Sequence, residues 1–451
     1  MTSEVLRLLR YNTGNDKKVF VNFKDNFDAV IFNASIVAHS GSAIADLVSV
    51  HKNQYIIDPQ THIFQHDLNS LQPFKKKGHE LKTSIQKYFD ELPKSLTKII
   101  LTQHRPLQSQ EVLEYVDDLC ASVYKFETEF VNNFIKTKEY DKYLEFAGKK
   151  PEPKLIIAPY FMIKKEYMVG QVQSWMKTNQ QCLEKFIRFN NSRYEIAAQL
   201  VIDKEILVNE DILEKIINAY DLNGFNYIFI WIDEFSSFYA QESEKIAFKT
   251  LLEGFTRIGK KAVMSYGGYD SIILCNSGNP NRVYGVAQSI GYGESRPITP
   301  VGGGLPTNKY YFYPIHKRIK FSEAADILSN QGYFDKQKLA SEYAQDYFDK
   351  ICSCEQCKTV IKDNIDNFNL YNDTIPFYIN GKYGKIARNR PTTDASFISA
   401  MHFMQSKVRE WDEIKYKSYE EILSDLQSKS KVYSSNSDYE NILQWCEIYA
   451  E

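Results

Sequence analysis

The segment that decides the fold is Glu195–Phe235, EIAAQLVIDKEILVNEDILEKIINAYDLNGFNYIFIWIDEF. Two runs within it, 195–203 and 226–235, are β-branched, aromatic and apolar on both faces, as expected of strands buried in a parallel sheet. The stretch between them, 209–225, has an apolar stripe at helical spacing, a capping Asn209 and a helix-ending Gly224. The segment therefore predicts a strand–helix–strand unit.

Similar apolar runs recur along the chain, at 28–38, 54–64, 97–104, 153–163, 261–269 and 282–294. Together with the first two they predict eight strands that alternate with helices, which favours a (β/α)8 TIM-like barrel. A doubly wound open sheet is the alternative. We expect a barrel domain at 1–320 with a charged, aromatic-rich helical insertion at about 105–150. A helical C-terminal subdomain should follow at 321–451, and its last part, 417–451, reads as two amphipathic helices.

The composition is that of a soluble globular protein, with 43% hydrophobic and 25% charged residues. A formal net charge of −2 excludes a strong overall attraction to nucleic acid or to membranes. The sequence shows no signal peptide and no run of about 18 apolar residues, so we expect no membrane partner. Seven cysteines in a chain of this size favour a reducing compartment, which predicts a cytoplasmic protein.

Three of the cysteines stand close together in ICSCEQCK, residues 351–358, with the spacing C-x-C-x-x-C. Zinc takes four sulfur or nitrogen ligands in a tetrahedron, so Cys352, Cys354 and Cys357 leave one position for a fourth ligand. His402 is the next histidine along the chain, and His316 is the nearest one before the cluster. A Cys3His site with all four positions filled would be structural. Free thiols or a disulfide are the alternatives.

Polar or special residues stand at the carboxyl ends of several predicted strands, where a parallel barrel builds its active site. The alternative explanation for these polar residues is that strands commonly end in polar loops. The residues are Asp58, Asp203, Asp233, Glu234, Tyr266, Gly267, Gly268 and Glu294.

The barrel order followed by C-x-C-x-x-C and a later histidine resembles the tRNA-guanine transglycosylase family, which includes the queuine and archaeosine enzymes and DNA-modifying relatives. YIIDPQTHIFQ (55–65) and AVMSYGGYDSII (262–273) are similar to two of its strand-and-loop segments. The resemblance covers about 28–402 and is one of order and spacing. It implies exchange or modification of a guanine or 7-deazaguanine base in tRNA or DNA, a structural Zn²⁺ on the Cys3His set, and a homodimer or a paralogue partner.

The resemblance also implies roles for the carboxylates. Asp58 would be the general acid/base, Asp203 falls where the family reads the base with Gln, and Asp233 and Glu234 fall in its base-contacting stretch. The family's nucleophilic Asp on the last barrel strand is missing from 283–296, where Glu294 is the only carboxylate and hence the candidate nucleophile. Tyr266, Gly267 and Gly268 would contact the substrate. The strand at 153–163 lacks the family's substrate-binding Asp. Asp58 as a turn starter before Pro59, and Glu294 in a salt bridge with Arg296, are the structural alternatives.

Two basic stretches are candidate nucleic-acid contacts: Lys75, Lys76 and Lys77 in PFKKKGHELK, and His316 and Arg318 in YPIHKR. A solvated surface explains both equally. Two other functions stay open. One is a catalytically degenerate paralogue that acts as a nucleic-acid-binding or regulatory subunit. The other is a barrel hydrolase, a nucleosidase or nuclease, that uses Asp58, Asp233 and Glu234 on a metal.

Overall fold

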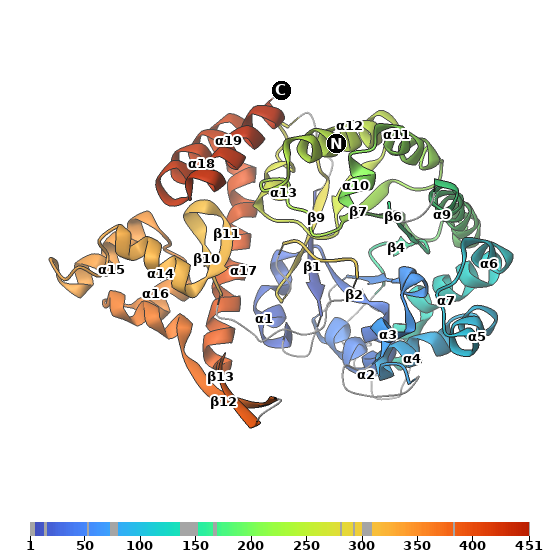
Figure 1. Ribbon diagram of the computed structural model, residues 1–451, viewed down its shortest axis with the longest axis horizontal. Helices are drawn as coiled ribbons and strands as arrows, with labels where there is room; N and C mark the ends of the chain where they lie inside the picture. The colour runs from blue at the N-terminus through green and yellow to red at the C-terminus, as the bar shows by residue number, and fades with distance from the viewer. Residues whose placement is uncertain are drawn as a thin grey trace. The chain divides into compact units, whose positions relative to one another are not determined.

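The computed structural model describes residues 5–12, 16–51, 54–72, 80–135, 152–165, 169–279, 282–291, 294–299, 309–381 and 384–450. These residues form two compact units (Figure 1). The first contains the described residues up to Cys275 together with 279–299, and the second contains 276–278 and the residues from 309 onward. The hairpin at 309–320, which we assigned to the barrel domain, thus lies in the second unit. No helix among the described residues has the length and apolar character needed to cross a membrane.

A nearly closed parallel barrel sheet forms the centre of the first unit. Its strands pair in sequence order, and the last strand returns to pair with the first, Leu8 lying beside Ala287. The strands are β1 (Leu6–Tyr11), β2 (Ala29–Asn33), β3 (Tyr55–Asp58), β4 (Ile156–Ile157), β5 (Met162–Ile163), β6 (Ile196–Ile202), β7 (Tyr227–Ile232), β8 (Lys261–Met264) and β9 (Gly285–Ser289). An open doubly wound sheet would keep two separate edges, whereas the ends of this sheet, at β3 and β4, come close enough for one bridge between Tyr55 and Pro153.

The strands β4 and β5 both pair with β6 and together take one position in the barrel. Between β3 and the segment that leads into β4, the strand pairing is reduced to one isolated bridge, Tyr55 with Pro153. Beyond that bridge, side chains of the short helix η2 (Thr61–Gln65) take over the hydrogen bonds. Thr61 Oγ1 donates to the Tyr160 carbonyl at 2.6 Å, and Gln65 Nε2 donates to the Met162 carbonyl at 3.0 Å. Helix η2 thereby closes this gap in the barrel wall, because buried backbone carbonyl groups require hydrogen-bond donors and these two side chains supply them.

The predicted set of strands needs two corrections, one predicted strand that is a helix and one strand that was not predicted. The run 97–104 is helical, because it belongs to α5 (Lys94–Gln103), which buries Leu96, Thr97 and Ile100 at helical spacing. The first barrel strand is β1, which we did not predict. The total of eight positions was therefore reached with one false strand and one missed strand.

Helices surround the barrel strands (Figure 1). In α11, Asn209 caps the helix by accepting from the Ile212 amide at 3.1 Å, and Leu213, Ile216 and Ile217 are buried, as predicted. The segment expected as a helical insertion is helical in its described part, which contains α6 and α7; residues 136–151 lie outside the described residues. The helices are α1 (Asp16–Phe23), α2 (Ala34–His51), α3 (Leu68–Leu71), α4 (Thr83–Glu91), α5, α6 (Ser109–Glu114), α7 (Val116–Ile135), α9 (Val169–Asn190), α10 (Lys204–Leu207), α11 (Glu210–Ala219), α12 (Glu242–Arg257) and α13 (Tyr269–Ile273).

The second unit is mainly helical. It begins with a hairpin of β10 (Lys309–Phe312) and β11 (Lys317–Lys320) and contains a second hairpin, β12 (Thr374–Gly381) with β13 (Gly384–Pro391). The two predicted C-terminal helices are present as α18 and α19. The helices are α14 (Phe321–Asn330), α15 (Ala340–Lys350), α16 (Glu355–Ile361), α17 (Thr393–Tyr416), α18 (Tyr419–Tyr433) and α19 (Asn436–Ala450).

Candidate functional site

A buried ion pair lies at the carboxyl ends of the first barrel strands. Arg10 Nη1 donates to Asp58 Oδ2 at 2.9 Å, and each side chain is 1% exposed. The same Nη1 lies 3.4 Å from Asn33 Oδ1, and Nε donates to the Ser265 carbonyl at 2.8 Å. Tyr160 OH donates to the other carboxylate oxygen, Asp58 Oδ1, at 2.6 Å. Strands β1, β2, β3 and β8 and the β4–β5 connection thus all contribute to one polar centre.

Aromatic side chains complete a ring of contacts that starts and ends at this ion pair. The ring continues from Tyr160 to His62 (stacked, centroids 5.4 Å apart), to Trp231 (5.5 Å) and to Tyr266 (5.0 Å). The Arg10 guanidinium lies 4.5 Å from the Tyr266 centroid and closes the ring. We call this set the barrel-mouth ring; its six members are Arg10, Asp58, His62, Tyr160, Trp231 and Tyr266, none more than 5% exposed.

Burial sets the protonation of the ring. Burial, together with the adjacent Asp58 charge, raises the pKa of Tyr160 well above its usual value, so its hydroxyl stays a donor. Burial, His66 and the nearby cations lower the pKa of His62 well below its usual value, so the imidazole is neutral. Although burial by itself lowers the pKa of Arg10, Tyr266 and Asp58 raise it. Within the ring, Arg10 is therefore a cation, His62 a neutral imidazole and Tyr160 a hydroxyl donor.

Two polar atoms of the ring, Arg10 Nη2 and His62 Nδ1, have no hydrogen-bond partner among the described residues. A buried polar group without a partner costs on the order of 1–3 kcal/mol.

A loop after β9 is held at the ends of β7 and β8. Arg296 Nη1 donates to Tyr266 OH at 2.7 Å, and Trp231 Nε1 donates to the Arg296 carbonyl at 3.0 Å. Asp233 Oδ1 accepts from the Ile298 amide at 2.7 Å, and the Glu234 amide donates to the Arg296 carbonyl at 3.2 Å. Asp233 and Glu234, expected to contact substrate, therefore hold this loop next to the barrel-mouth ring.

The predicted glycines permit close approaches. A Cβ on Gly267 would lie 2.7 Å from Ser271 Oγ and 2.8 Å from Val286 Cγ1. A Cβ on Gly268 would lie 3.2 Å from Glu294 Cδ. Gly268 thus lets Glu294, the candidate nucleophile, lie against the end of β8, two residues after Tyr266.

The remaining predicted site residues have other surroundings. Asp203 caps α10, since its carboxylate accepts from the Ile206 and Lys165 amides, both at 2.8 Å, so its observed contacts are structural. His316 is buried and its Nδ1 lies 2.7 Å from Glu410 Oε1, which makes it an internal group and not a surface contact for phosphate. Arg318 lies 5.0 Å over the Phe403 ring. Lys75, Lys76 and Lys77 lie outside the described residues.

The Cys3His cluster is formed as the spacing predicts. The ligand atoms of Cys352, Cys354, Cys357 and His402 all lie within 4.8 Å of one another, and all four residues are buried. A tetrahedral ion with 2.3 Å bonds to sulfur has sulfur–sulfur edges of about 3.8 Å, so the set fits one ion. All seven cysteines are free thiols, which excludes the disulfide alternative for this structure. The Cys3His cluster is the one group found among the described residues that could hold a metal ion. Asp58, Asp233 and Glu234 therefore do not form a second candidate metal site there.

Local structure orients the metal ligands. Cys354 is the N-cap of α16, and its sulfur accepts from the Cys357 amide at 3.3 Å. His402 presents Nδ1 to the sulfurs of Cys354 and Cys357, at 3.2 and 3.4 Å. Its Nε2 lies 2.7 Å from the Tyr311 carbonyl, an outer hydrogen bond of the kind that fixes a metal-binding imidazole. The sulfur of Cys357 further contacts the hydroxyls of Tyr310, Tyr347 and Tyr371.

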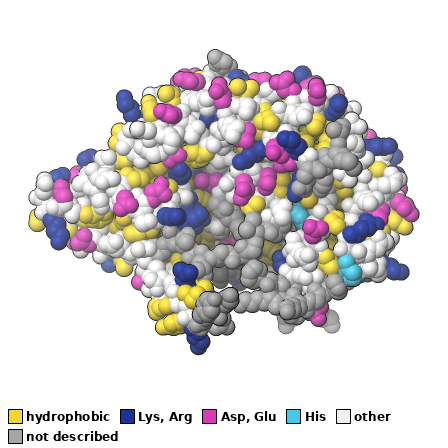
Figure 2. Space-filling model, viewed as in Figure 1, with side chains coloured by type: hydrophobic (Ala, Val, Ile, Leu, Met, Phe, Trp, Pro, Cys, Tyr) yellow, Lys and Arg dark blue, Asp and Glu magenta, His cyan; other side chains and the backbone are white. Residues whose placement is uncertain are grey.

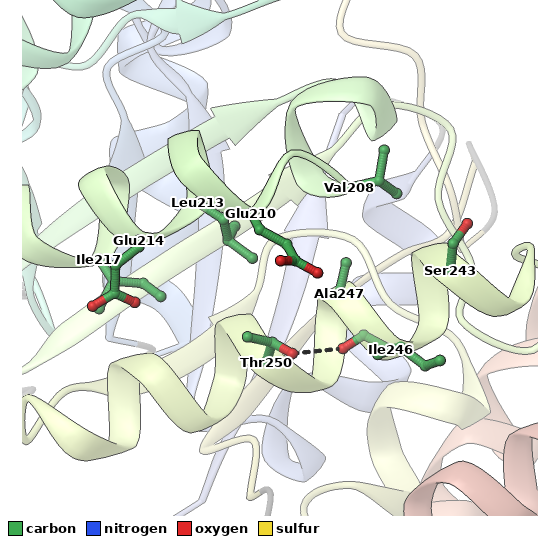
Figure 3. A pocket seen from close by; sticks show the side chains of 9 residues that line it. All are labelled: Val208, Glu210, Leu213, Glu214, Ile217, Ser243, Ile246, Ala247 and Thr250. Atoms are coloured by element: carbon green, nitrogen blue, oxygen red, sulfur yellow. Dashed lines mark hydrogen bonds between the residues drawn. The ribbon is translucent and has the colours of Figure 1, made fainter.

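A surface groove of about 440 Å³ lies between α11 and α12, outside the barrel (Figure 3). Glu214 at its edge is paired with Arg257 at 2.8 Å, and Ile246 is 49% exposed. The groove brings together no nucleophile and no acid–base pair. Its lining residues are Val208, Glu210, Leu213, Glu214, Ile217, Ser243, Ile246, Ala247 and Thr250.

The ring includes four residues that sequence reasoning missed: Arg10, His62, Tyr160 and Trp231. Arg10 had a usable indication, since an Arg that is buried within the apolar strand LRLLRY requires a polar partner. The chain matches no protein-family model, and no curated protein sequence is significantly similar to it.

Proposed function

We propose that this protein is a transglycosylase-like enzyme with a (β/α)8 barrel, which exchanges or modifies a guanine or 7-deazaguanine base in tRNA or DNA. The observation that carries the proposal is the buried Asp58 carboxylate, held by Arg10 and Tyr160 at the end of β3 and surrounded by flat aromatic side chains. A purine-like heterocycle matches such a ring in shape, and its edge atoms match the partnerless Arg10 Nη2 and His62 Nδ1.

The chemistry assigns separate roles to two carboxylates. A base exchange proceeds through two displacements, so a nucleophile must form a covalent bond to the sugar as the first base leaves. Glu294 is the candidate nucleophile. Asp58 would start protonated, give that proton to the leaving base, and then as a carboxylate take the proton of the entering base, so that it ends protonated as it began. Arg10 Nη1, which lies 2.9 Å from Asp58 Oδ2, would hold that carboxyl group in place through both steps.

We propose further that the Cys3His cluster binds Zn²⁺. The donor set is one that zinc prefers, and four protein ligands leave no position for a reacting water. The ion would then stabilise the fold of the second unit without a part in the chemistry.

The test is incorporation of labelled guanine and of a labelled 7-deazaguanine into tRNA and into DNA. We expect incorporation into one of the two nucleic acids, and a loss of at least about 100-fold in Asp58→Asn and in Glu294→Gln. Asp211→Asn, an exposed carboxylate on α11, is the matched control. Absence of incorporation with both nucleic acids, or an Asp58→Asn variant as active as the wild type, would overturn the proposal.

A second candidate is a subunit that binds the base without turnover. It is favoured by the contacts of Asp58, because both carboxylate oxygens are already engaged, one by Arg10 and one by Tyr160. Binding of guanine by calorimetry without any incorporation would support this candidate in place of the enzyme.

A further inference from the structure

The hairpin of β12 and β13 in the second unit is exposed on both of its faces. Its strands pair only with each other, in an antiparallel register that places Ile375 opposite Arg390 and Phe377 opposite Arg388. Every described residue of β13 from Gly384 to Arg390 is exposed. In Figure 1 the two strands form a separate orange ribbon next to the start of α17.

Apolar and aromatic side chains on this ribbon face solvent. Tyr378 is 67% exposed, Ile386 44% and Ile375 41%. A two-stranded hairpin without support from other elements is marginally stable in water. An exposed ribbon with such side chains therefore favours a binding partner, whose contact would cover them.

The charge of the ribbon indicates which partner that is. Between Asp373 and Asp394 the sequence has no acidic residue. The exposed cations are Lys385, Arg388 and Arg390, spread along one strand, with Arg390 lying 5.9 Å from the Phe377 ring. This differs from the chain as a whole, whose formal net charge is −2, and from much of the surface in Figure 2, where both signs of charge are interspersed. A cationic strand next to the exposed Tyr378 ring is complementary to a phosphate backbone and its bases.

We propose that the β12–β13 ribbon is a nucleic-acid-binding arm, which contacts phosphates through Lys385, Arg388 and Arg390. A two-stranded ribbon is narrow enough to enter the major groove of a B-form duplex, and residues two apart on a strand place their side chains about 7 Å apart along the backbone. The inference adds the surface through which the nucleic acid would bind, and it rests on the proposed function for the reaction that follows binding.

The test compares the full-length wild type with the triple variant Lys385→Gln/Arg388→Gln/Arg390→Gln. Binding to labelled duplex DNA, to single-stranded DNA and to a folded tRNA is measured by fluorescence anisotropy over a range of salt concentrations. We expect the triple variant to bind at least about tenfold more weakly to the preferred nucleic acid. The slope of log K against log salt should become shallower by up to about 2.7, because each phosphate contact contributes about 0.9.

The matched control removes three exposed cations from helices of the same unit, in Lys350→Gln/Lys358→Gln/Lys431→Gln. This control should bind as the wild type does. Equal affinity and equal salt slope of the ribbon variant and the wild type would overturn the proposal. So would a wild-type dimer that the ribbon variant alone fails to form, with nucleic-acid binding unchanged, since the ribbon would then be a contact between copies of the chain.

The two proposals fail in different ways. The ribbon variant should still bind free guanine, and Asp58→Asn should still bind nucleic acid with an unchanged salt slope. A wild type that binds nucleic acid through the ribbon but incorporates no base would remove the proposed function and leave the arm in place.

Discussion

Arg10 of β1 and Asp58 of β3 form an ion pair in which Nη1 lies 2.9 Å from Oδ2 and neither side chain is more than 1% exposed. The two residues meet because β1 and β3 both pair with β2 in the barrel sheet, so their side chains reach each other across that one strand. A buried pair of this kind is costly to break by removing one partner, since the other charge stays buried without compensation.

Arg10→Met should therefore destabilise the protein by about 3–5 kcal/mol. The double variant Arg10→Met/Asp58→Asn should recover part of that loss, because it leaves no charge unpaired while Tyr160 keeps an oxygen to donate to. Urea unfolding gives both values. Arg257→Met, which breaks the exposed pair with Glu214, is the control and should cost under about 1 kcal/mol. A double variant less stable than Arg10→Met would contradict this account of the pair.

Glu127 on α7 should reduce stability at high pH. Burial raises the pKa of this carboxyl well above its usual value, and Oε1 accepts from the Ile157 amide at 3.2 Å. A group whose folded pKa is raised contributes stability below its ordinary pKa and loses it as the pH rises, by at most about 1.4 kcal/mol per pH unit. Glu127→Gln keeps the acceptor, so it should stabilise the protein more at pH 8 than at pH 5. The exposed Glu129→Gln on the same helix should show no such difference; equal effects of Glu127→Gln at both pH values would refute the prediction.

His62 and His66 should make the protein sensitive to acid. Burial is the main cause that lowers the pKa of His66 to about 4, and it also lowers the pKa of His62. The unfolded chain binds protons that the folded chain excludes, so stability falls as the pH drops from about 6.5 to 4. His66 alone accounts for roughly 3 kcal/mol over that range. The slope of unfolding free energy against pH should flatten in His66→Gln and stay unchanged in the exposed His39→Gln; parallel slopes would argue against the prediction.

Cys354→Ser should lose bound zinc and stability together, because its sulfur both faces His402 and caps α16. Purified wild type should contain about one equivalent of zinc by elemental analysis. Cys446→Ser, a buried thiol of α19 outside the cluster, should lower stability but keep the zinc, and Asp58→Asn should keep it as well. Wild type with less than about half an equivalent would remove zinc as the ligand of this site.

Much of the barrel could be predicted because buried parallel strands carry a local sequence pattern. The runs around Ile230 and Val201 are apolar on both faces, which few other environments require. The pattern failed where a run was short. Ile99, Ile100 and Leu101 read as a strand, yet a helix that buries only Ile100 of the three satisfies the same residues. Strand β1 was missed because Arg7 and Arg10 interrupt its apolar run.

The sequence by itself determined most of the strand–helix alternation and the three cysteines of the candidate metal site, since helix periodicity, strand composition and cysteine spacing are properties of neighbouring residues. Only the tertiary structure decided the barrel-mouth ring. Its contacts join residues that are between 35 positions (Trp231 and Tyr266) and 256 positions (Arg10 and Tyr266) apart along the chain. These contacts depend on barrel closure, on helix η2 bridging β3 and β5, and on the loop that Asp233 holds. Burial also decided the roles of polar residues, because a partner inside the protein turned His316 and Asp203 into structural groups and made Arg10 the counter-ion of Asp58.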